Sequence, residues 1–278
     1  MTSDPAPRPP LDKVRLTGPH RGTLRDVRVE VVDQLPSTNI VVAQRARSGA
    51  PEGLVVVADH QSAGRGRLDR SWESPAGSAV TFSILLRPTS AARSWPWLPL
   101  LTGYAVDRAL RAFGLETGVK WPNDVLIGDK KVCGILVERI ETSQGPAAIV
   151  GVGINVSTTA EELPVPHATS LEIELGRAVD RTDVLLEVLG EVRSTYDAWE
   201  AGDVHDGMRL AEVYAAACVT LGREVRVDLP DGRVLAGTAS GIDPSGQLLV
   251  RVGGAVHAVS AGDVVHVRTR PDGATDPG

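Results

Sequence analysis

The chain has 278 residues, which is enough for one large domain and one small one. With 42% hydrophobic and 23% charged residues, its composition is ordinary for a globular protein. The net charge of −6 argues against a dedicated nucleic-acid binder, and two cysteines are too few for a disulfide framework. No apolar run approaches the ~20 residues that cross a bilayer, and the proline-rich start is unlike a secretory signal. Together these features predict a cytoplasmic protein.

The first half of the chain begins with a segment rich in proline, arginine and glycine, which predicts a flexible arm over residues 1–24. Apolar periodicity then predicts, in chain order, a strand at 27–31, a helix at 38–48 that Ser37 can cap, a buried strand at 54–58, a strand at 80–86 and an amphipathic helix at 98–113. Residues 59–77 carry no such pattern. A loop of that length is uncommon unless it is functional.

The second half predicts a hairpin of strands at 125–127 and 132–140, a strand at 147–156, and helices at 182–201 and 207–217. After Cys218, short β-type runs alternate with turn signals, which is typical of a small β-barrel. The expected division is therefore an arm at 1–24, a main domain at 25–217, a β-domain at 218–268 and a flexible tail at 269–278.

The long loop contains Gly64-Arg65-Gly66-Arg67, followed by Arg70 and Trp72. Glycines let the backbone approach a ligand closely, and arginines offer planar donors for a carboxylate or phosphate. The loop lacks the Gly-Lys-Ser/Thr ending of a Walker P-loop. A merely solvated basic loop is the alternative interpretation.

Lysines cluster at a second place. Only four of the 29 basic residues are lysines, and three of those four lie between residues 120 and 131. In Lys120-Trp121-Pro122-Asn123-Asp124 the proline makes a rigid corner from which the polar side chains can reach one ligand, with Asp124 available for Mg²⁺. Lys131 enters a strand that has Gly134 three residues later, and Asn155 ends an apolar strand. Solvated lysines on turns, and an asparagine that only satisfies a turn, are the alternatives.

In this order, the motifs resemble those of biotin–protein ligases. The resemblance covers about residues 27–160 and rests on Ser37-Thr38-Asn39, Gly64 to Arg67, Lys120 to Asp124, Lys131 to Glu138 and Gly151 to Asn155. It implies an α+β fold: a catalytic domain like class II aminoacyl-tRNA synthetases and lipoate ligases, with a mixed sheet, and an SH3-like C-terminal barrel. It also implies an ATP-dependent ligase that forms biotinyl-5'-AMP and transfers biotin to a lysine of biotin carboxyl-carrier domains.

The resemblance further implies roles for individual residues. The expected catalytic residues are Arg65, Arg67, Lys120 and Lys131. The expected biotin contacts are Ser37, Thr38, Asn39, Gln61, Gly64, Arg65, Gly66, Arg67, Lys131 and Gly134. The expected ATP or adenylate contacts are Arg67, Arg70, Trp72, Lys120, Asn123, Asp124 and Asn155, with Asp124 able to meet Mg²⁺ through ATP. Asp69 stands where the family often has glycine, which leaves the details of loop closure open.

Biotin, ATP and Mg²⁺ are expected as substrates, without a tightly bound prosthetic group. The expected partner is the biotin carboxyl-carrier domain of acyl-CoA carboxylases, with no nucleic acid or membrane, and the protein is expected to be a monomer or weak homodimer. About 26 residues precede the first expected strand, too few for a winged-helix repressor module, so a monofunctional ligase is expected. A lipoate or octanoyl ligase is the nearest rival, and a binding-only homologue is a further alternative.

Overall fold

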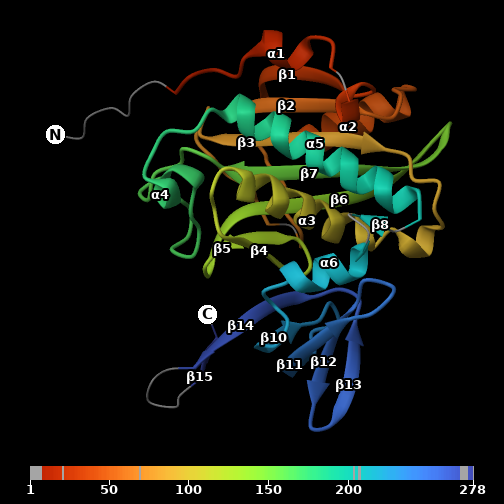
Figure 1. Ribbon diagram of the computed structural model, residues 1–278, viewed down its shortest axis with the longest axis vertical. Helices are drawn as coiled ribbons and strands as arrows, with labels where there is room; N and C mark the ends of the chain where they lie inside the picture. Colours follow the sequence, from red (N-terminus) through yellow and green to blue (C-terminus); the bar gives the residue numbers. More distant parts are fainter. Residues whose placement is uncertain are drawn as a thin grey trace.

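The main domain is built on one mixed sheet. The computed structural model describes residues 8–20, 22–68, 70–202, 204–205, 208–269 and 275–277. Within them, seven strands lie in the order β1-β2-β3-β7-β6-β5-β4 (Figure 1). Their bounds are β1 (Arg28–Leu35), β2 (Leu54–Gln61), β3 (Ala79–Leu86), β4 (Thr117–Lys120), β5 (Asp124–Ile127), β6 (Lys130–Thr142) and β7 (Gly145–Asn155). β1 and β2 are parallel and the other neighbours antiparallel, which confirms the expected mixed sheet.

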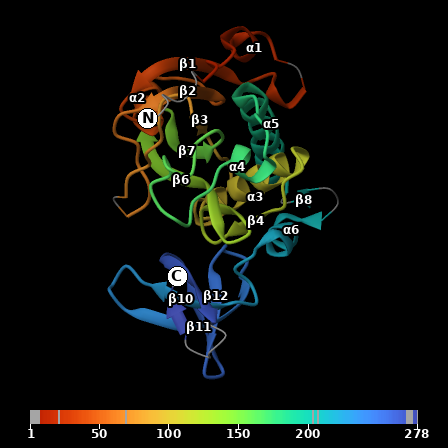
Figure 2. The same cartoon turned by 90° about the vertical axis from the view of Figure 1, so that its left-hand side faces the viewer.

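Helices cover both faces of this sheet. α2 (Thr38–Arg47) lies on one face, while α3 (Trp97–Ala112) and α5 (Arg181–Glu200) lie on the other (Figure 2). Alternate residues of β2 therefore serve two cores: Val55 and Val57 pack on the α3 and α5 side, and Val56 packs on the α2 side. Burial on both faces explains why this strand reads as a continuous apolar run.

The N-terminal segment differs from the expected flexible arm. Its described part contains the short helix α1 (Lys13–Thr17), which Asp12 caps by accepting a hydrogen bond from the Arg15 N–H at 3.0 Å. Leu11 and Leu16 are buried in the main core. The prediction is therefore wrong from Leu11 to Thr17; a helix of five residues is too short to show apolar periodicity. Residues 1–7 lie outside the described residues.

Three further short helices complete the main domain: η1 (Gly22–Leu24), η2 (Ala92–Ser94) and α4 (Leu171–Leu175). The helix expected at 207–217 begins later, as α6 (Leu210–Ala217), because Met208 and Arg209 form β9 (Met208–Arg209), which pairs with β8 (Val204–His205).

The C-terminal part is a separate antiparallel sheet below the main domain (Figure 1). It has the order β13-β12-β11-β10-β14-β15, with β10 (Glu224–Asp228), β11 (Val234–Ile242), β12 (Leu248–Val252), β13 (Ala255–Val259), β14 (Asp263–Thr269) and β15 (Thr275–Pro277). The small β-domain is as expected. Part of the expected tail is not free, because β15 pairs with β14; residues 270–274 and 278 lie outside the described residues.

Two tryptophans of the main domain form hydrogen bonds with the C-terminal domain. The Trp97 Nε1–H donates to the Pro244 carbonyl at 2.9 Å, and the Trp121 Nε1–H donates to the Gly246 carbonyl at 3.0 Å. The Trp121 backbone N–H donates to Thr220 Oγ1 at 3.1 Å. Hydrogen bonds from buried groups fix the relative orientation of the domains. Among the described residues, no helix is long and apolar enough to span a membrane.

Candidate active site

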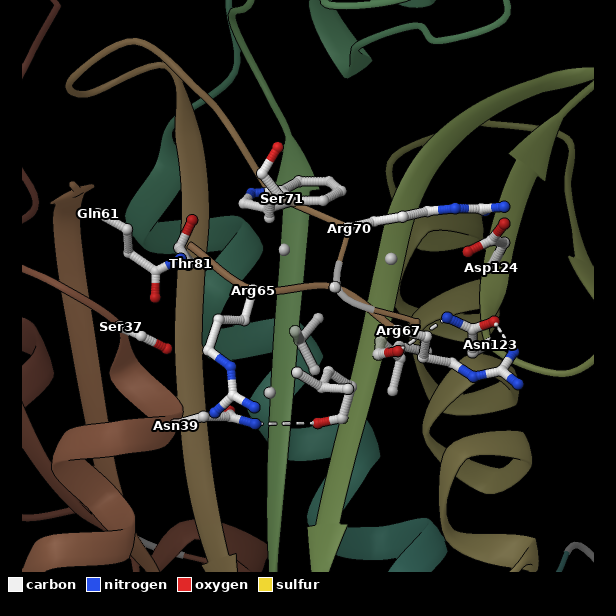
Figure 3. Close-up of a pocket in the computed structure, with 18 of the residues that line it drawn as sticks. Ser37, Asn39, Gln61, Arg65, Arg67, Arg70, Ser71, Thr81, Asn123 and Asp124 are labelled. Atoms are coloured by element: carbon white, nitrogen blue, oxygen red, sulfur yellow. Dashed lines mark hydrogen bonds between the residues drawn. The ribbon is translucent and has the colours of Figure 1, made fainter. Parts of the chain in front are cut away.

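A pocket lies on the sheet face next to the start of α2, and the loop between β2 and β3 closes it (Figure 3). The wall includes most of the residues expected at a site. Those expected residues are Ser37, Thr38, Asn39, Gln61, Arg65, Gly66, Arg67, Arg70, Trp72, Asn123, Asp124, Lys131 and Gly134. Because Gly151 and Gly153 also line the pocket, all five sequence motifs meet in one place.

One end of the pocket is built from uncharged polar side chains and lies beside the Arg65–Glu138 ion pair. Ser37, Thr38 and Asn39 are buried there at the start of α2. The Thr38 N–H and hydroxyl both donate to Gln61 Oε1, at 2.7 and 3.1 Å. Ser37 occupies the cap position as expected, but its side chain makes no capping hydrogen bond and points into the pocket instead (Figure 3). This end can recognise a neutral group that carries both donors and acceptors.

Asn39 is held by residues that sequence reasoning did not single out. Its amide nitrogen donates to Glu138 Oε2 at 2.7 Å, and its Oδ1 lies 2.6 Å from the Ser83 hydroxyl. A Cβ at Gly151 would lie only 2.2 Å from Asn39 Oδ1, so this position of β7 needs glycine. The two hydrogen bonds fix the orientation of the Asn39 amide toward the pocket.

Glycines also form the floor on which Trp72 lies. Gly134 of β6 and Gly153 of β7 are paired neighbours, and a Cβ at Gly153 would lie 2.4 Å from Trp72 Cε2. The indole Nε1 is buried without a hydrogen-bond partner, and Lys131 Nζ lies 5.9 Å from the indole ring centroid. Gly151 and Gly153 lie on one face of β7, so their spacing of two is the sequence signal that indicates close approach by Asn39 and Trp72.

Three arginines of the loop reach in three directions (Figure 3). Arg65 pairs with Glu138 at 3.1 Å, and Arg67 donates to Asn123 Oδ1 at 2.9 Å. Arg70 pairs with Asp263 of the C-terminal domain. Asp69, the departure from the family pattern, lies outside the described residues.

The other end of the pocket is cationic. Lys131 Nζ lies 2.7 Å from Asp124 Oδ1, so one carboxylate accompanies the lysine. Burial lowers the pKa of Arg67; the charges of Asp124 and Asp263 oppose this effect, and Arg70 adds to it. Lys120 lines an adjoining cleft rather than the pocket itself, beside Arg70 and Asp124. Burial also lowers the pKa of Lys120, against the opposing charges of Asp124 and Asp263 and with a smaller lowering contribution from Lys131. Such a cluster of partly buried cations suits an anionic ligand.

Two further expected residues lie outside the pocket wall. Asn155 is buried and its amide donates to the Thr169 carbonyl at 3.0 Å, so it links the end of β7 to the backbone before α4. Gly64 permits the loop to fold on itself, since a Cβ there would lie 2.2 Å from the Trp72 carbonyl oxygen. Their expected contacts with adenylate and biotin stay predictions.

Cys133 is buried under the pocket, and burial raises the pKa of its thiol. A thiol in that state is a poor nucleophile. Its place in the core gives Cys133 a packing role.

Comparison with known proteins gives the class first. Residues 31–155 match the Biotin/lipoate A/B protein ligase family, and residues 220–267 match the Biotin protein ligase C terminal domain. The two matches fall on the main domain and the C-terminal sheet respectively. Together they describe a two-domain ligase.

Individual relatives narrow this class. The biotin--[acetyl-CoA-carboxylase] ligase of Mycobacterium tuberculosis is 40% identical over 276 residues, covering 96% of this chain and all of the relative. The bifunctional ligase/repressor BirA of Bacillus subtilis is 35% identical, covering 84% of this chain and 72% of the relative. A solved structure of biotin protein ligase from Aquifex aeolicus with biotin and ATP has a TM-score of 0.71 at 29% identity, covering 85% and 97% of the two chains. The chain belongs to the biotin protein ligase family.

Proposed function

We propose that the protein forms biotinyl-5'-AMP from biotin and ATP and then transfers biotin to a lysine of biotin carboxyl-carrier domains of carboxylases. The observation that carries this proposal is the pocket, which joins the buried uncharged polar side chains at the start of α2 to an end that carries arginine and lysine. Biotin has the same two ends, a neutral ureido ring and a carboxylate. The M. tuberculosis relative, matched over its whole length, carries the name of this activity.

At the polar end, Thr38, Asn39 and Gln61 are the partners we assign to the ureido ring. Gln61 and Asn39 are already fixed by hydrogen bonds to the protein, so little ordering is needed when the ring binds. The carboxylate of biotin then extends toward Lys131 and Arg67, whose charges attract it and the α-phosphate of ATP together.

The first step is positioning and charge stabilisation. A carboxylate oxygen of biotin attacks the α-phosphorus, and the bond to pyrophosphate breaks. Lys131, Arg67 and Lys120 offset the negative charge that gathers on the phosphate oxygens. Mg²⁺ arrives with ATP as part of the substrate, and Asp124 supplies a carboxylate of the kind that Mg²⁺ accepts beside phosphate oxygens and water.

In the second step the carrier lysine attacks the acyl carbon as a neutral amine, an amide bond forms and AMP leaves. The amine must lose a proton, and we assign to Asp124 the role of orienting the amine or of accepting this proton. The loop that carries Arg65 and Arg67 covers the pocket and keeps water from the mixed anhydride. We expect Arg65→Ala to release biotinyl-AMP faster, and an unaltered release rate would contradict this role.

The test is incubation with biotin, MgATP and an active carrier domain, followed by intact-protein mass measurement. We expect a gain of one biotinyl group on the carrier and equimolar pyrophosphate. Lipoate and octanoate in place of biotin provide the matched comparison. No gain with biotin, or a larger gain with lipoate, would overturn the proposal.

The setting of the reaction follows from its substrates. Because it consumes ATP, we propose that it takes place in the cytoplasm. The net charge of −6 supports action without nucleic acid. We further propose a monomer or weak homodimer, which sedimentation at several concentrations would test.

A further inference from the structure

The C-terminal domain reaches into the closing loop of the pocket at one turn, Gly262-Asp263, where β14 begins. The two terminal nitrogens of Arg70 face the two carboxylate oxygens of Asp263, with Nη1 and Oδ1 3.4 Å apart. Beside them, Arg67 Nη2 donates to the Gly262 carbonyl at 3.3 Å. Two of the three loop arginines are therefore held by the other domain.

This turn is fixed in place by its own packing. A Cβ at Gly262 would lie 2.8 Å from Val227 Cγ1 and 3.1 Å from the Asp228 carbonyl, so the turn lies tightly against β10. Asp263 is the register partner of Asp228 and starts a paired strand. Its carboxylate is about one-third exposed, at 32%, whereas the Arg70 side chain is 63% exposed. The anchored partner is thus Asp263, and the freer one is Arg70.

The three loop arginines differ in the number and kind of their partners. Arg65 is held by Glu138 of β6, and Arg67 is held by Asn123 as well as by Gly262. Among the described residues, the carboxylate that pairs with Arg70 is that of Asp263, and the hydrogen bond to Asp263 raises the pKa of Arg70. Removing the Asp263 charge therefore loosens one end of the loop while the other two contacts persist.

We infer that Asp263 is a positioning residue of the ligase reaction, which holds the loop from Ser62 to Trp72 closed through Arg70 and so keeps the acyl-adenylate bound. This inference rests on the proposed function. It makes the C-terminal domain part of the active site, because the lid of the pocket needs that domain to stay shut. The pair is partly exposed, so its loss should raise the escape of biotinyl-AMP about two- to fivefold.

The experiment compares Asp263→Asn with the wild type in two readouts. The first is trypsin cleavage after Arg65, Arg67 and Arg70 in the ligand-free protein, which reports loop opening without any need for catalysis. The second is the rate at which biotinyl-AMP leaves the enzyme after it forms without carrier. We expect both to rise in Asp263→Asn, and Asp263→Glu to restore them.

The matched control is Asp231→Asn, which removes the same charge from an arginine pair in the same domain. Asp231 pairs with Arg233 on an exposed turn. This control should leave cleavage and escape at wild-type rates. Salt should speed escape from the wild type more than from Asp263→Asn, because the exposed ion pair is screened only where it exists.

The outcomes separate the two proposals. A wild type that makes no adenylate overturns the proposed function and the retention role with it, while the cleavage rates still report whether Asp263 holds the loop. Suppose that adenylate forms, that biotinyl-AMP leaves Asp263→Asn at the wild-type rate, and that trypsin cleaves the loop of this variant at the wild-type rate. Asp263 then does not position the loop. A lower KM for ATP with an unchanged escape rate would make Asp263 a competitor of phosphate and would also overturn the inference.

Discussion

Gly151→Ala tests how the polar end of the pocket is built. The new Cβ would lie 2.2 Å from Asn39 Oδ1 and 3.0 Å from Asn39 Cγ, which is far inside van der Waals contact. The Asn39 side chain must therefore move away from β7. Its hydrogen bonds to Ser83, at 2.6 Å, and to the charged Glu138, at 2.7 Å, cannot both survive that movement.

The cost follows from those two bonds. A neutral hydrogen bond contributes about 1 kcal/mol net and one to a charged group about 1.5–3 kcal/mol, so the loss of one or both lowers the free energy of unfolding by about 1–4 kcal/mol. Because Asn39 is one of the proposed ureido partners, biotin affinity should fall by about tenfold or more, which corresponds to about 1.4 kcal/mol.

Urea unfolding measures the first effect, and calorimetric titration with biotin measures the second. Gly190→Ala is the matched control, because Gly190 lies within α5 and a Cβ there would meet nothing within 4 Å. That control should be neutral or stabilising by up to about 1 kcal/mol. If Gly151→Ala unfolds like the wild type and binds biotin within twofold of it, the account of this end of the pocket is wrong.

Three other predictions follow from the site and the domain junction. Lys131→Ala should lower pyrophosphate release by about 100-fold or more with an unchanged circular dichroism spectrum; normal release would exclude its role. Burial lowers the pKa of His266 to about 4, so its contribution to stability is complete above pH 6.5 and is lost as the pH falls toward 4. Between these pH values the free energy of unfolding should therefore fall less in His266→Gln than in the wild type, by about 1 kcal/mol after allowance for solvent screening. Urea midpoints at pH 7 and 4.5 would show the difference. Cys133 should resist iodoacetamide in the native protein and react after unfolding, as mass measurement would detect.

Local patterns in the sequence were enough for most of the fold. The hairpin of β5 and β6 was predicted because Gly128-Asp129 interrupts two apolar runs, and Gly128 has a φ of +58°. α3, predicted from helical periodicity, and α5 were both predicted to within a residue or two of their ends. α1 was missed because one turn of helix has no period, and its burial depends on β1 and α5 lying beneath it.

The candidate site, like the fold, was predicted in part from local patterns. The residue types and their order indicated where a carboxylate and a phosphate would meet, since glycines, arginines and lysines gather in two short segments. What the sequence could not indicate was which residues hold these groups in place. Glu138 meets Asn39 across 99 residues, and Asp263 meets Arg70 across 193.

The sequence by itself therefore determined the family, most of the strands and longer helices, and the chemistry that the loop and the lysine cluster bring to the site. Only the tertiary structure decided that the Asn155 amide donates to the Thr169 carbonyl, and that Gly151 and Gly153 of β7 leave space for Asn39 and Trp72. It also decided that the second domain contacts the loop through Asp263 and Arg70. The physical reason is range. Propensity, periodicity and turn chemistry act between neighbours in the chain, whereas steric fit and charge pairing depend on which distant segments the sheet and the domain junction bring together.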